Sequence, residues 1–417
     1  MQWGLACVSS YLPVLPQQGV PNSNERRFRD VDSHLPKGTT MTIVVTGATG
    51  HLGRLTIESL LAKGVEADDI VAAGRRTETL ADRAALGVRT ARIDFNDPVS
   101  LRAGFTDADT VLLISGNEPG RRVQQHQNAI QAAKDAGVEH LVYTSALKAT
   151  TTPAILAADH KATEEIIAAS GLPSTILRNG PYTENYLATM EQARATGVII
   201  ASVGDGRVAS ASRKDYAEAA AVVLTNNDEH IGKVYELSGD VAWNYHELAA
   251  TITEIVGRDV VYTPVSPQDY LPILVEYGLD EGMAGFVVGL DGETRAGLSS
   301  ETPRELSALI GRPTTPLAQG LSDPAAAPGF SLELLLRVSR QRADMGEASA
   351  RQGSDQSGGL PRWVLHGCGQ AVDQGPDAFS RSVNGSRRLR PVHSGSRLPK
   401  RNRDAGVRSG DLRFHDR

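Results

Sequence analysis

Cysteine is almost absent from this chain of 417 residues, which contains only Cys7 and Cys368. Both lie outside residues 41–321, the long middle segment in which regular apolar patterns occur. Nucleophilic thiols, disulfides and cysteine-ligated metal sites are therefore excluded from that segment.

Basic charge is also scarce in the middle segment. Residues 41–321 hold 23 Lys plus Arg against 36 Asp plus Glu, whereas residues 322–417 hold 16 basic and 10 acidic residues. A nucleic-acid backbone requires a basic face, so we expect no nucleic-acid partner for the middle segment. The basic residues of the C-terminal stretch have no interleaved aromatic residues for base stacking, so we interpret that stretch as a solvated tail rather than a nucleic-acid arm.

No apolar run approaches the ~20 residues that span a bilayer, and residues 1–20 lack the basic start and the apolar stretch of a signal peptide. We therefore expect no membrane span, and the cytoplasm is the default compartment. Residues 322–417 are rich in Arg, Ser, Gly and Gln and poor in apolar residues, which predicts a disordered tail. Residues 1–40 are expected to be a disordered or non-native extension, because Met41 directly precedes the first apolar run.

The most informative pattern that is present is Thr46-Gly47-Ala48-Thr49-Gly50-His51-Leu52-Gly53, which directly follows the apolar run Met41–Val45. Gly47 permits a tight turn, Gly50 lets the backbone approach a pyrophosphate, and Gly53 lets a helix pack closely on a strand. Glycines at this spacing between a strand and a helix predict a dinucleotide-binding turn.

The residues that follow complete a βαβ unit. Apolar residues recur at helical spacing over residues 52–63, and Ile70–Gly74 is expected to be a second strand, so the helix N-terminus would face the phosphates. The second strand ends in Arg75-Arg76, where an NAD-selective site usually carries Asp or Glu, and an arginine there can pair with a 2′-phosphate. We predict NADPH as the cofactor, with NADH bound more weakly. The alternative is that both arginines are solvated charges that open the next helix.

Strand and helix patterns alternate along the first half of the middle segment. This alternation predicts an α/β fold, a doubly wound parallel (Rossmann) sheet covered on both faces, with a smaller C-terminal substrate lobe where the alternation loosens. The predicted domain covers residues 41–321, with its Rossmann core in 41–180 and the lobe in 181–321. The further strands expected are Val88–Ile93, Thr110–Ile114, His140–Thr144 and Ser174–Arg178 in the core and Val198–Ile200, Lys233–Leu237 and Val260–Tyr262 in the lobe, and the helices are Thr77–Leu86, one from Pro98, Arg121–Ala136 and Leu156–Ser170.

The Gly-x-x-Gly-x-x-Gly spacing resembles that of extended and atypical short-chain dehydrogenase/reductases. The resemblance implies a Ser or Thr after the fifth strand and a Tyr-x-x-x-Lys on the next helix; Ser145 and Lys161 fit, but the tyrosine position is Ala157. Such a tyrosine exchanges a proton with an alcohol oxygen while hydride moves at carbon, so alcohol or ketone chemistry should be slow without it. A quinone does not need it, because the oxyanion formed by hydride addition is delocalised over the ring.

A narrower resemblance comes from Leu177–Leu187, Leu-Arg-Asn-Gly-Pro-Tyr-Thr-Glu-Asn-Tyr-Leu, which is similar to a segment of the bacterial type 2 NAD(P)H:quinone oxidoreductases, relatives of the NmrA-like proteins. Gly204-Asp205-Gly206, Gly232–Leu237 and Leu309–Thr315 also resemble that family. The resemblance covers essentially the whole middle segment. It implies an enzyme that reduces quinones by two electrons with NADPH, through direct hydride transfer and without flavin or metal.

By this resemblance the cofactor and the quinone are held by separate segments. The cofactor would be bound by Gly47, Thr49, Gly50, His51, Leu52 and Arg75, together with Gly53 of the motif, and by Ser115, Gly116 and Asn117 at its ribose. The quinone site would comprise Asn179, Tyr182, Thr183, Glu184, Asn185, Tyr186 and Leu187. The expected catalytic residues are Lys161, Tyr182 and Asn185. Amides would donate hydrogen bonds and tyrosines would offer flat rings, while Lys161 would bind the nicotinamide ribose or stabilise a quinol oxyanion.

Alternatives remain at three levels. Lys161 could be a surface lysine beside Glu164 and Glu165, and His160 is interpreted as a helix-surface histidine. The quinone segment could be a loop and helix start with Thr183 as its cap. The whole chain could be an NmrA-like redox-sensing regulator that binds NADP without catalysis. A quinone is the expected partner, and the chain is compatible with a homodimer.

Overall fold

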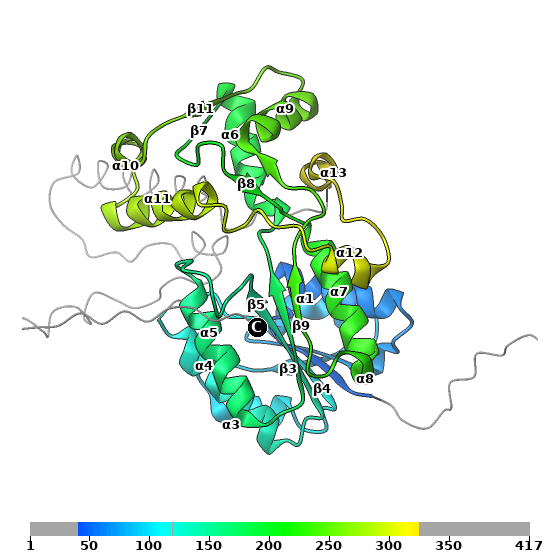
Figure 1. Cartoon of the computed structure of the whole chain (residues 1–417). Coiled ribbons are helices and arrows are strands. Elements are labelled where there is room, and N and C mark those ends of the chain that lie inside the picture. Colours follow the sequence, from blue (N-terminus) through cyan, green and yellow to red (C-terminus); the bar gives the residue numbers. More distant parts are fainter. Residues whose placement is uncertain (1–40, 119, 325–417) are drawn as a thin grey trace, which may run out of the picture. The chain divides into compact units, whose positions relative to one another are not determined.

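The computed structural model describes residues 41–118 and 120–324 (Figure 1). The predicted doubly wound α/β fold is confirmed, because seven strands form one sheet in the order β3-β2-β1-β4-β5-β6-β9 and every adjacent pair is parallel. The expectations for residues 1–40, and for the tail beyond residue 324, lie outside the described residues. The strands are β1 (Ile43–Val45), β2 (Ile70–Gly74), β3 (Arg89–Arg92), β4 (Thr110–Leu113), β5 (His140–Ala146), β6 (Ser174–Asn179) and β9 (Val234–Leu237).

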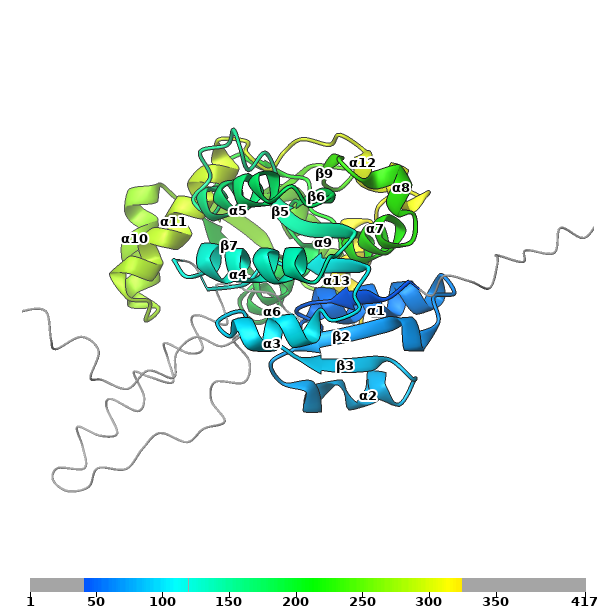
Figure 2. The ribbon, with the colours of Figure 1, turned by 90° about the horizontal axis from the view of Figure 1, so that it is seen from below.

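Helices cover both faces of this sheet. One face packs against α1 (His51–Ala62), α7 (Arg213–Thr225) and α12 (Glu305–Ile310), and the other against α3 (Pro98–Gly104), α4 (Arg122–Asp135) and α5 (Ala157–Ser170) (Figure 1). Figure 2 shows α4 and α5 side by side along their face. The central strands are buried on both sides, which is why their sequences read as continuous apolar runs rather than as alternating ones.

Helix starts follow their capping residues. Before α7, the Ser212 hydroxyl accepts from the Asp215 backbone N–H at 3.1 Å, and the Asp215 carboxylate accepts from the Ser212 N–H at 3.3 Å. Asn244 and Glu247 form the same reciprocal pair at the start of α9 (Tyr245–Val256). Such pairs satisfy backbone donors that have no partner within the helix.

One predicted lobe strand belongs to the main sheet. Residues 233–237 were expected in the lobe, but β9 pairs with β6 as the seventh strand of the sheet. After β6 the chain forms part of the lobe and returns to the sheet through α7, so β6, α7 and β9 form a crossover. The inserted lobe segment makes this crossover difficult to recognise in the sequence. The predicted helix Thr77–Leu86 is also different, being a 3₁₀ turn, η2 (Thr77–Leu80), followed by the short helix α2 (Ala81–Ala84). The minor helices η1 (Ala67–Asp69) and α8 (Asn227–His230) lie in connections of the core.

The remaining elements form the lobe beyond the sheet. Two small pairings hold it together, one between β7 and β11 in parallel and one between β8 and β10 in antiparallel orientation. Its elements are η3 (Thr183–Tyr186), α6 (Leu187–Thr196), β7 (Val198–Ala201), β8 (Arg207–Val208), β10 (Trp243–Asn244), α9, β11 (Val261–Pro264), α10 (Pro267–Glu276), α11 (Glu281–Arg295) and α13 (Leu317–Ser322). Of the helices in the described part of the chain, none has the length and apolar character to cross a bilayer.

Candidate functional site

The glycine motif forms a tight turn between β1 and α1. Gly47 has a φ of +61°, and the Gly50 N–H donates to the Gly47 carbonyl at 2.9 Å. A Cβ at Gly53 would lie 2.6 Å from the Gly47 carbonyl oxygen and 2.8 Å from the Ala48 Cα. The predicted tight turn at Gly47 and the close packing at Gly53 are therefore confirmed, and both require glycine.

The N-terminus of α1 is built to meet an anion. Gly50 is the N-cap and brings no side chain to this end of the helix, and its first turn contains no acidic residue. The N–H groups of the first turn and the positive end of the helix dipole are then directed at the space beyond the turn. This is the arrangement that binds phosphate groups in dinucleotide folds.

The end of β2 supplies the cations. The Thr49 methyl group packs against Gly74, where a Cβ would come within 3.0 Å of it, so the motif and the end of β2 are neighbours. The Arg75 side chain is 40% exposed and lies 3.3 Å from a Glu118 carboxylate oxygen. A solvent-exposed ion pair of this kind contributes little to the stability of the fold. The Nε of Arg76 is buried and has no hydrogen-bond partner in the structure. Both arginines could therefore bind a phosphate group at the end of β2.

The loop after β4 is held from behind by a buried histidine. The Gly116 N–H donates to His126 Nε2 at 3.0 Å, so Nδ1 carries the proton and donates to the Thr163 hydroxyl at 3.0 Å, which donates to the Asp159 carbonyl at 2.8 Å. Burial, more than the nearby Arg122 charge, lowers the pKa of His126 to about 3. Sequence reasoning missed this residue, although it lies on the buried stripe of α4 with Ala129, Ile130 and Ala133, a spacing that would have flagged it.

His160 is not a helix-surface histidine, so that interpretation was wrong. It is 7% exposed, and its ring nitrogens contact the Tyr143 hydroxyl at 2.9 Å and the Arg122 guanidinium at 3.4 Å. Burial lowers the pKa of His160 to about 4. The cause is the packing of α5 on β5 and α4, which turns this helix position towards the sheet.

Ser145, the residue at the serine position of the short-chain reductases, is committed to a carboxylate. Its hydroxyl donates to Glu164 at 2.6 Å, and the same carboxylate receives two donors of Arg178 at 2.6 and 3.0 Å. Arg178 also donates to Glu236 at 2.8 Å, and these carboxylates raise the pKa of its guanidinium. This network joins β5, α5, β6 and β9, which identifies its role as structural.

Lys161 lies on the protein surface, as in the alternative interpretation of this residue. Its side chain is 52% exposed, and its Nζ is 4.0 Å from the Glu165 carboxylate one helical turn away. The contact is an exposed pair of the kind that adds a few tenths of a kcal/mol. A catalytic role for Lys161 stays a prediction.

Three side chains of the predicted quinone segment point inward. The Thr183 hydroxyl is 3.0 Å from the Ser210 hydroxyl, and Glu184 accepts from the Arg213 backbone N–H at 2.8 Å. Leu187 is buried in the core of the lobe. The residue that precedes η3 is Tyr182, with no side-chain cap, so the interpretation of Thr183 as a helix cap was wrong. Direct contact of these three residues with a quinone stays a prediction.

The other members of the segment line the carboxyl end of β6. The Tyr182 ring meets the Tyr216 ring edge-on at 5.2 Å, and the Tyr186 ring meets the Trp243 ring edge-on at 4.7 Å. Burial is the main cause that raises the pKa of both Tyr182 and Tyr186, so both phenols stay protonated at neutral pH. At Asn179, the side-chain oxygen Oδ1 is buried and has no hydrogen-bond partner in the structure. A buried acceptor of this kind favours a ligand that brings a donor.

Arg213 is the second functional residue that the sequence did not reveal. It is the first residue of α7 and is 7% exposed, with its guanidinium carbon 4.8 Å from the Tyr182 ring centroid. Its Nη2 donates to Asn185 Oδ1 at 3.3 Å, and its Nη1 is 3.8 Å from a Glu184 carboxylate oxygen. Its charge also contributes to the lowered pKa of His51 in the glycine motif, after burial. Arg213 thus contacts the predicted quinone segment from α7, the helix that packs against α1, although nothing in the local sequence distinguishes it from an exposed arginine.

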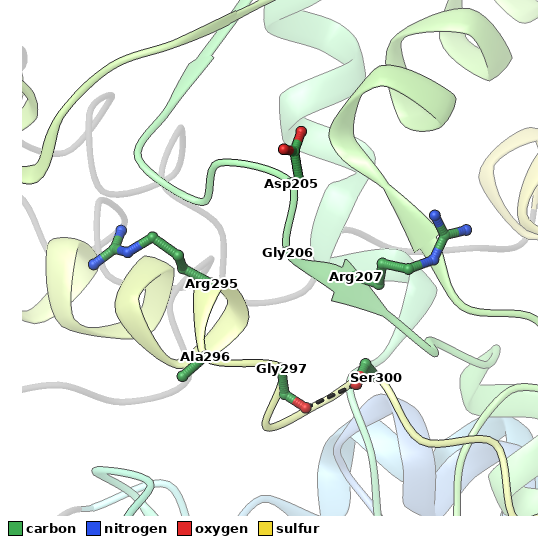
Figure 3. A pocket seen from close by; sticks show the side chains of 7 residues that line it. All are labelled: Asp205, Gly206, Arg207, Arg295, Ala296, Gly297 and Ser300. Carbon is green, nitrogen blue, oxygen red and sulfur yellow. Dashed lines mark hydrogen bonds between the residues drawn. The ribbon is translucent and has the colours of Figure 1, made fainter.

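A hollow of about 480 Å³ lies in the lobe (Figure 3). Figure 3 shows the guanidinium groups of Arg207 and Arg295 directed away from each other, so the wall between them is largely backbone at Gly206 and Gly297. Its strand β8 pairs with β10, which carries Trp243, the ring that contacts Tyr186. The hollow is therefore connected to the quinone segment through β8, its partner strand β10 and the Trp243 ring.

Comparison with known proteins adds independent evidence. The NmrA-like family model matches residues 39–316. Quinone oxidoreductase 2 of Escherichia coli is 45% identical over 281 residues, 67% of this chain and 97% of that protein. The crystal structure of the E. coli NADPH-dependent quinone oxidoreductase with NADPH has a TM-score of 0.65 at 44% identity, covering 67% of this chain and 99% of that one. Citrobacter triphenylmethane reductase with NADP(H) has a TM-score of 0.64 at 37% identity, with coverage of 67% and 99%.

Proposed function

Because the chain belongs to the NmrA-like family, we propose that it is an NADPH-dependent quinone oxidoreductase that reduces quinones by two electrons through direct hydride transfer, without flavin or metal. The observation that carries this proposal is the aromatic and amide-rich segment at the carboxyl end of β6, which Arg213 contacts from α7, a helix packed against α1 of the dinucleotide turn. Residues 41–321 would form the functional domain, in agreement with the extent of the family match. A cytoplasmic location and a homodimer stay predictions from the sequence.

The residues present fit NADPH. Gly47, Gly50 and Gly53 keep the turn compact, since an added Cβ at Gly53 would clash with the turn's own backbone, and α1 directs its N-terminal N–H groups at the space beyond the turn. Arg75 and Arg76, with one buried Nε lacking a partner, suit a 2′-phosphate. Related structures solved with NADPH or NADP(H) support the choice of cofactor.

The nicotinamide end fits as well. Among the described residues the Oδ1 of Asn179 has no partner and could accept from a carboxamide, and we expect the loop of Ser115, Gly116 and Asn117, in which His126 holds Gly116, to contact the ribose. When bound, NADPH supplies a hydride. The chain contributes orientation and polarity around that step rather than a proton.

The acceptor is expected to be a flat ring with delocalised oxygens. Tyr182 and Tyr186 present neutral aromatic side chains, and Asn185 presents an amide. Residue 157 is alanine, and the Ser145 hydroxyl is occupied by Glu164, so neither can protonate a ketone oxygen during reduction. Water then protonates the quinol product after reduction, which a delocalised oxyanion tolerates and a ketone does not.

The test follows NADPH absorbance in the full chain with and without a simple benzoquinone, with the uncatalysed rate subtracted. We expect saturable loss of one NADPH per quinone and no semiquinone, detected as the absence of cytochrome c reduction. Asn185→Ala should lower kcat, whereas Gln192→Ala, a half-buried amide on α6 outside the predicted quinone segment, is the matched control and should keep it. Tight NADPH binding without turnover of any of several quinones would instead identify a redox sensor.

A further inference from the structure

We propose that Arg213 is a positioning residue of the quinone site: it fixes the Asn185 amide with its N–H₂ group towards the acceptor, and it places a positive charge behind Asn185 and Tyr182 that favours an acceptor oxygen gaining negative charge. The inference rests on the proposed function, since it assigns the electrostatic part of the same reaction. It assigns to an arginine on α7 the stabilisation that the short-chain reductases obtain from the tyrosine missing here.

The orientation of Asn185 follows from the chemistry of its partner. A guanidinium group has donors and no acceptor, so the Asn185 atom that lies 3.3 Å from Arg213 Nη2 must be the oxygen. The amide nitrogen, with two N–H donors, is then directed away from Arg213. The contact with Arg213 therefore fixes which side of the Asn185 amide donates. A donor with a fixed orientation is what stabilises an oxyanion.

The position of Arg213 follows from the sheet. α1 leaves the carboxyl end of β1, and α7 leads into β9, which is parallel to the other strands, so both helices begin at the carboxyl edge and pack against each other. His51, the first residue of α1, is near enough for the charge of Arg213 to lower its pKa. The cation therefore lies at the edge where a dinucleotide and its partner substrate meet in this fold.

The guanidinium of Arg213 is buried next to a carboxylate. The Glu184 carboxylate is 3.8 Å from the guanidinium and receives its close hydrogen bond, 2.8 Å, from the Arg213 backbone N–H instead. Burial lowers the pKa of Arg213, and the Glu184 charge raises it. A negative charge on an acceptor placed nearby would be attracted to this buried guanidinium.

The reaction supplies that negative charge. Hydride adds two electrons and one hydrogen nucleus to the quinone, which gives the hydroquinone monoanion; one proton from water then gives the hydroquinone. The monoanion is the species that a buried cation favours, because a charge in a water-poor site interacts more strongly than one in solvent. A neutral side chain at position 213 would remove this charge from the surroundings of the monoanion.

The experiment measures an anion directly, without turnover. 4-Nitrophenol, a flat phenol whose ionised form absorbs at a distinct wavelength, is titrated with pH in the presence of the full chain. An opposite charge at close range lowers a pKa by about 1–3 units, so the bound phenol should ionise at a lower pH than the free one. Arg213→Gln should abolish the difference and Arg213→Lys should restore part of it. Lys214→Gln removes the exposed cation next in sequence and should behave as the unchanged protein does.

Kinetics provide the second measurement. Arg213→Gln should lower kcat for benzoquinone by about 10²-fold, a loss typical of removing electrostatic support from a developing oxyanion, while the NADPH dissociation constant measured by fluorescence stays within about twofold. Asn185→Asp keeps a group that Arg213 can bind but removes the donor directed at the acceptor. It should lose both the nitrophenol shift and kcat, which tests the inference even if Arg213→Gln fails to fold.

The outcomes separate the two proposals. A nitrophenol pKa that is the same with the unchanged chain and with Arg213→Gln, or no binding of nitrophenol to the unchanged chain, would overturn the role of Arg213. Quinone turnover that survives Arg213→Gln would do the same and leave the quinone reductase standing. A lowered nitrophenol pKa in a chain that reduces no quinone would retain the anion-favouring arginine and overturn the proposed function.

Discussion

Two buried histidines predict a steep loss of stability in mild acid. His126 and His160 are held neutral, with pKa values of about 3 and about 4 against an ordinary value of 6.5. Because each folded-state pKa lies below the unfolded one, the stabilisation is complete above about pH 6.5 and is lost progressively as the pH falls towards the folded values. Protonation of either ring would also break the bonds that His126 accepts from Gly116 and that His160 accepts from Arg122.

The magnitude follows from proton linkage. One pH unit between the two pKa values costs about 1.4 kcal/mol per histidine, so lowering the pH from about 6.5 to about 4.5 should remove about 2–3 kcal/mol through His126 alone. His160 should add a similar amount over the same interval. The combined loss is a large part of the ~5–15 kcal/mol by which domains are normally stable.

The assay is urea unfolding of the full chain, followed by far-ultraviolet circular dichroism at several pH values across this interval. His126→Gln stays neutral at every pH and can still accept from the Gly116 N–H, so its free energy of unfolding should fall about 2–3 kcal/mol less than that of the unchanged chain. His246→Gln replaces an exposed histidine and should show the full loss. An equal pH dependence for His126→Gln and the unchanged chain would refute the assignment of a neutral buried imidazole.

Three other predictions concern the cofactor turn and the serine position. Gly53→Ala places a Cβ 2.6 Å from a backbone oxygen and should cost about 1–3 kcal/mol and weaken NADPH binding in a fluorescence titration, whereas Gly285→Ala, a helical position where an added Cβ meets nothing within 4 Å, should raise the melting temperature. Arg75→Asp should weaken NADPH binding about 10–100-fold and NADH binding far less; equal losses would exclude contact with the 2′-phosphate. Ser145→Ala should lower the free energy of unfolding by about 1–2 kcal/mol by removing a donor from Glu164 and should leave kcat within a few-fold, and a loss of kcat near 10³-fold would show that the serine is catalytic.

Local patterns predicted most of the sheet, because β1, β2, β4 and most of β5 are apolar runs that alternate with helices along the chain. The same reasoning misplaced β9, because a lobe segment lies between the end of β6 at Asn179 and the start of α7 at Arg213 and separates β9 in sequence from its neighbour in the sheet. Periodicity reports which face of a helix is apolar, but it does not tell which polar residue on that face will be satisfied. The apolar stripe of α4 could have predicted that His126 is buried, but not that its partner is Thr163 on α5. Arg213 depended on packing between α1 and α7, a contact that no local pattern contains.

At the positions that short-chain reductases use for proton transfer, this chain has residues with structural roles or none that can donate a proton. This difference affects which electron acceptors the chain can reduce. Ser145 is bonded to Glu164, Glu164 is paired with Arg178, and residue 157 has no hydroxyl. None of them can give a proton to an oxygen as it becomes negative. The remaining way to lower the energy of that oxygen is charge and fixed dipoles, which Arg213 and Asn185 supply. Electrostatic stabilisation of this kind suits an acceptor whose anion is already delocalised, and a localised alkoxide would still require a proton. We therefore expect alanine at position 157 to disfavour ketone reduction while it remains compatible with quinone reduction.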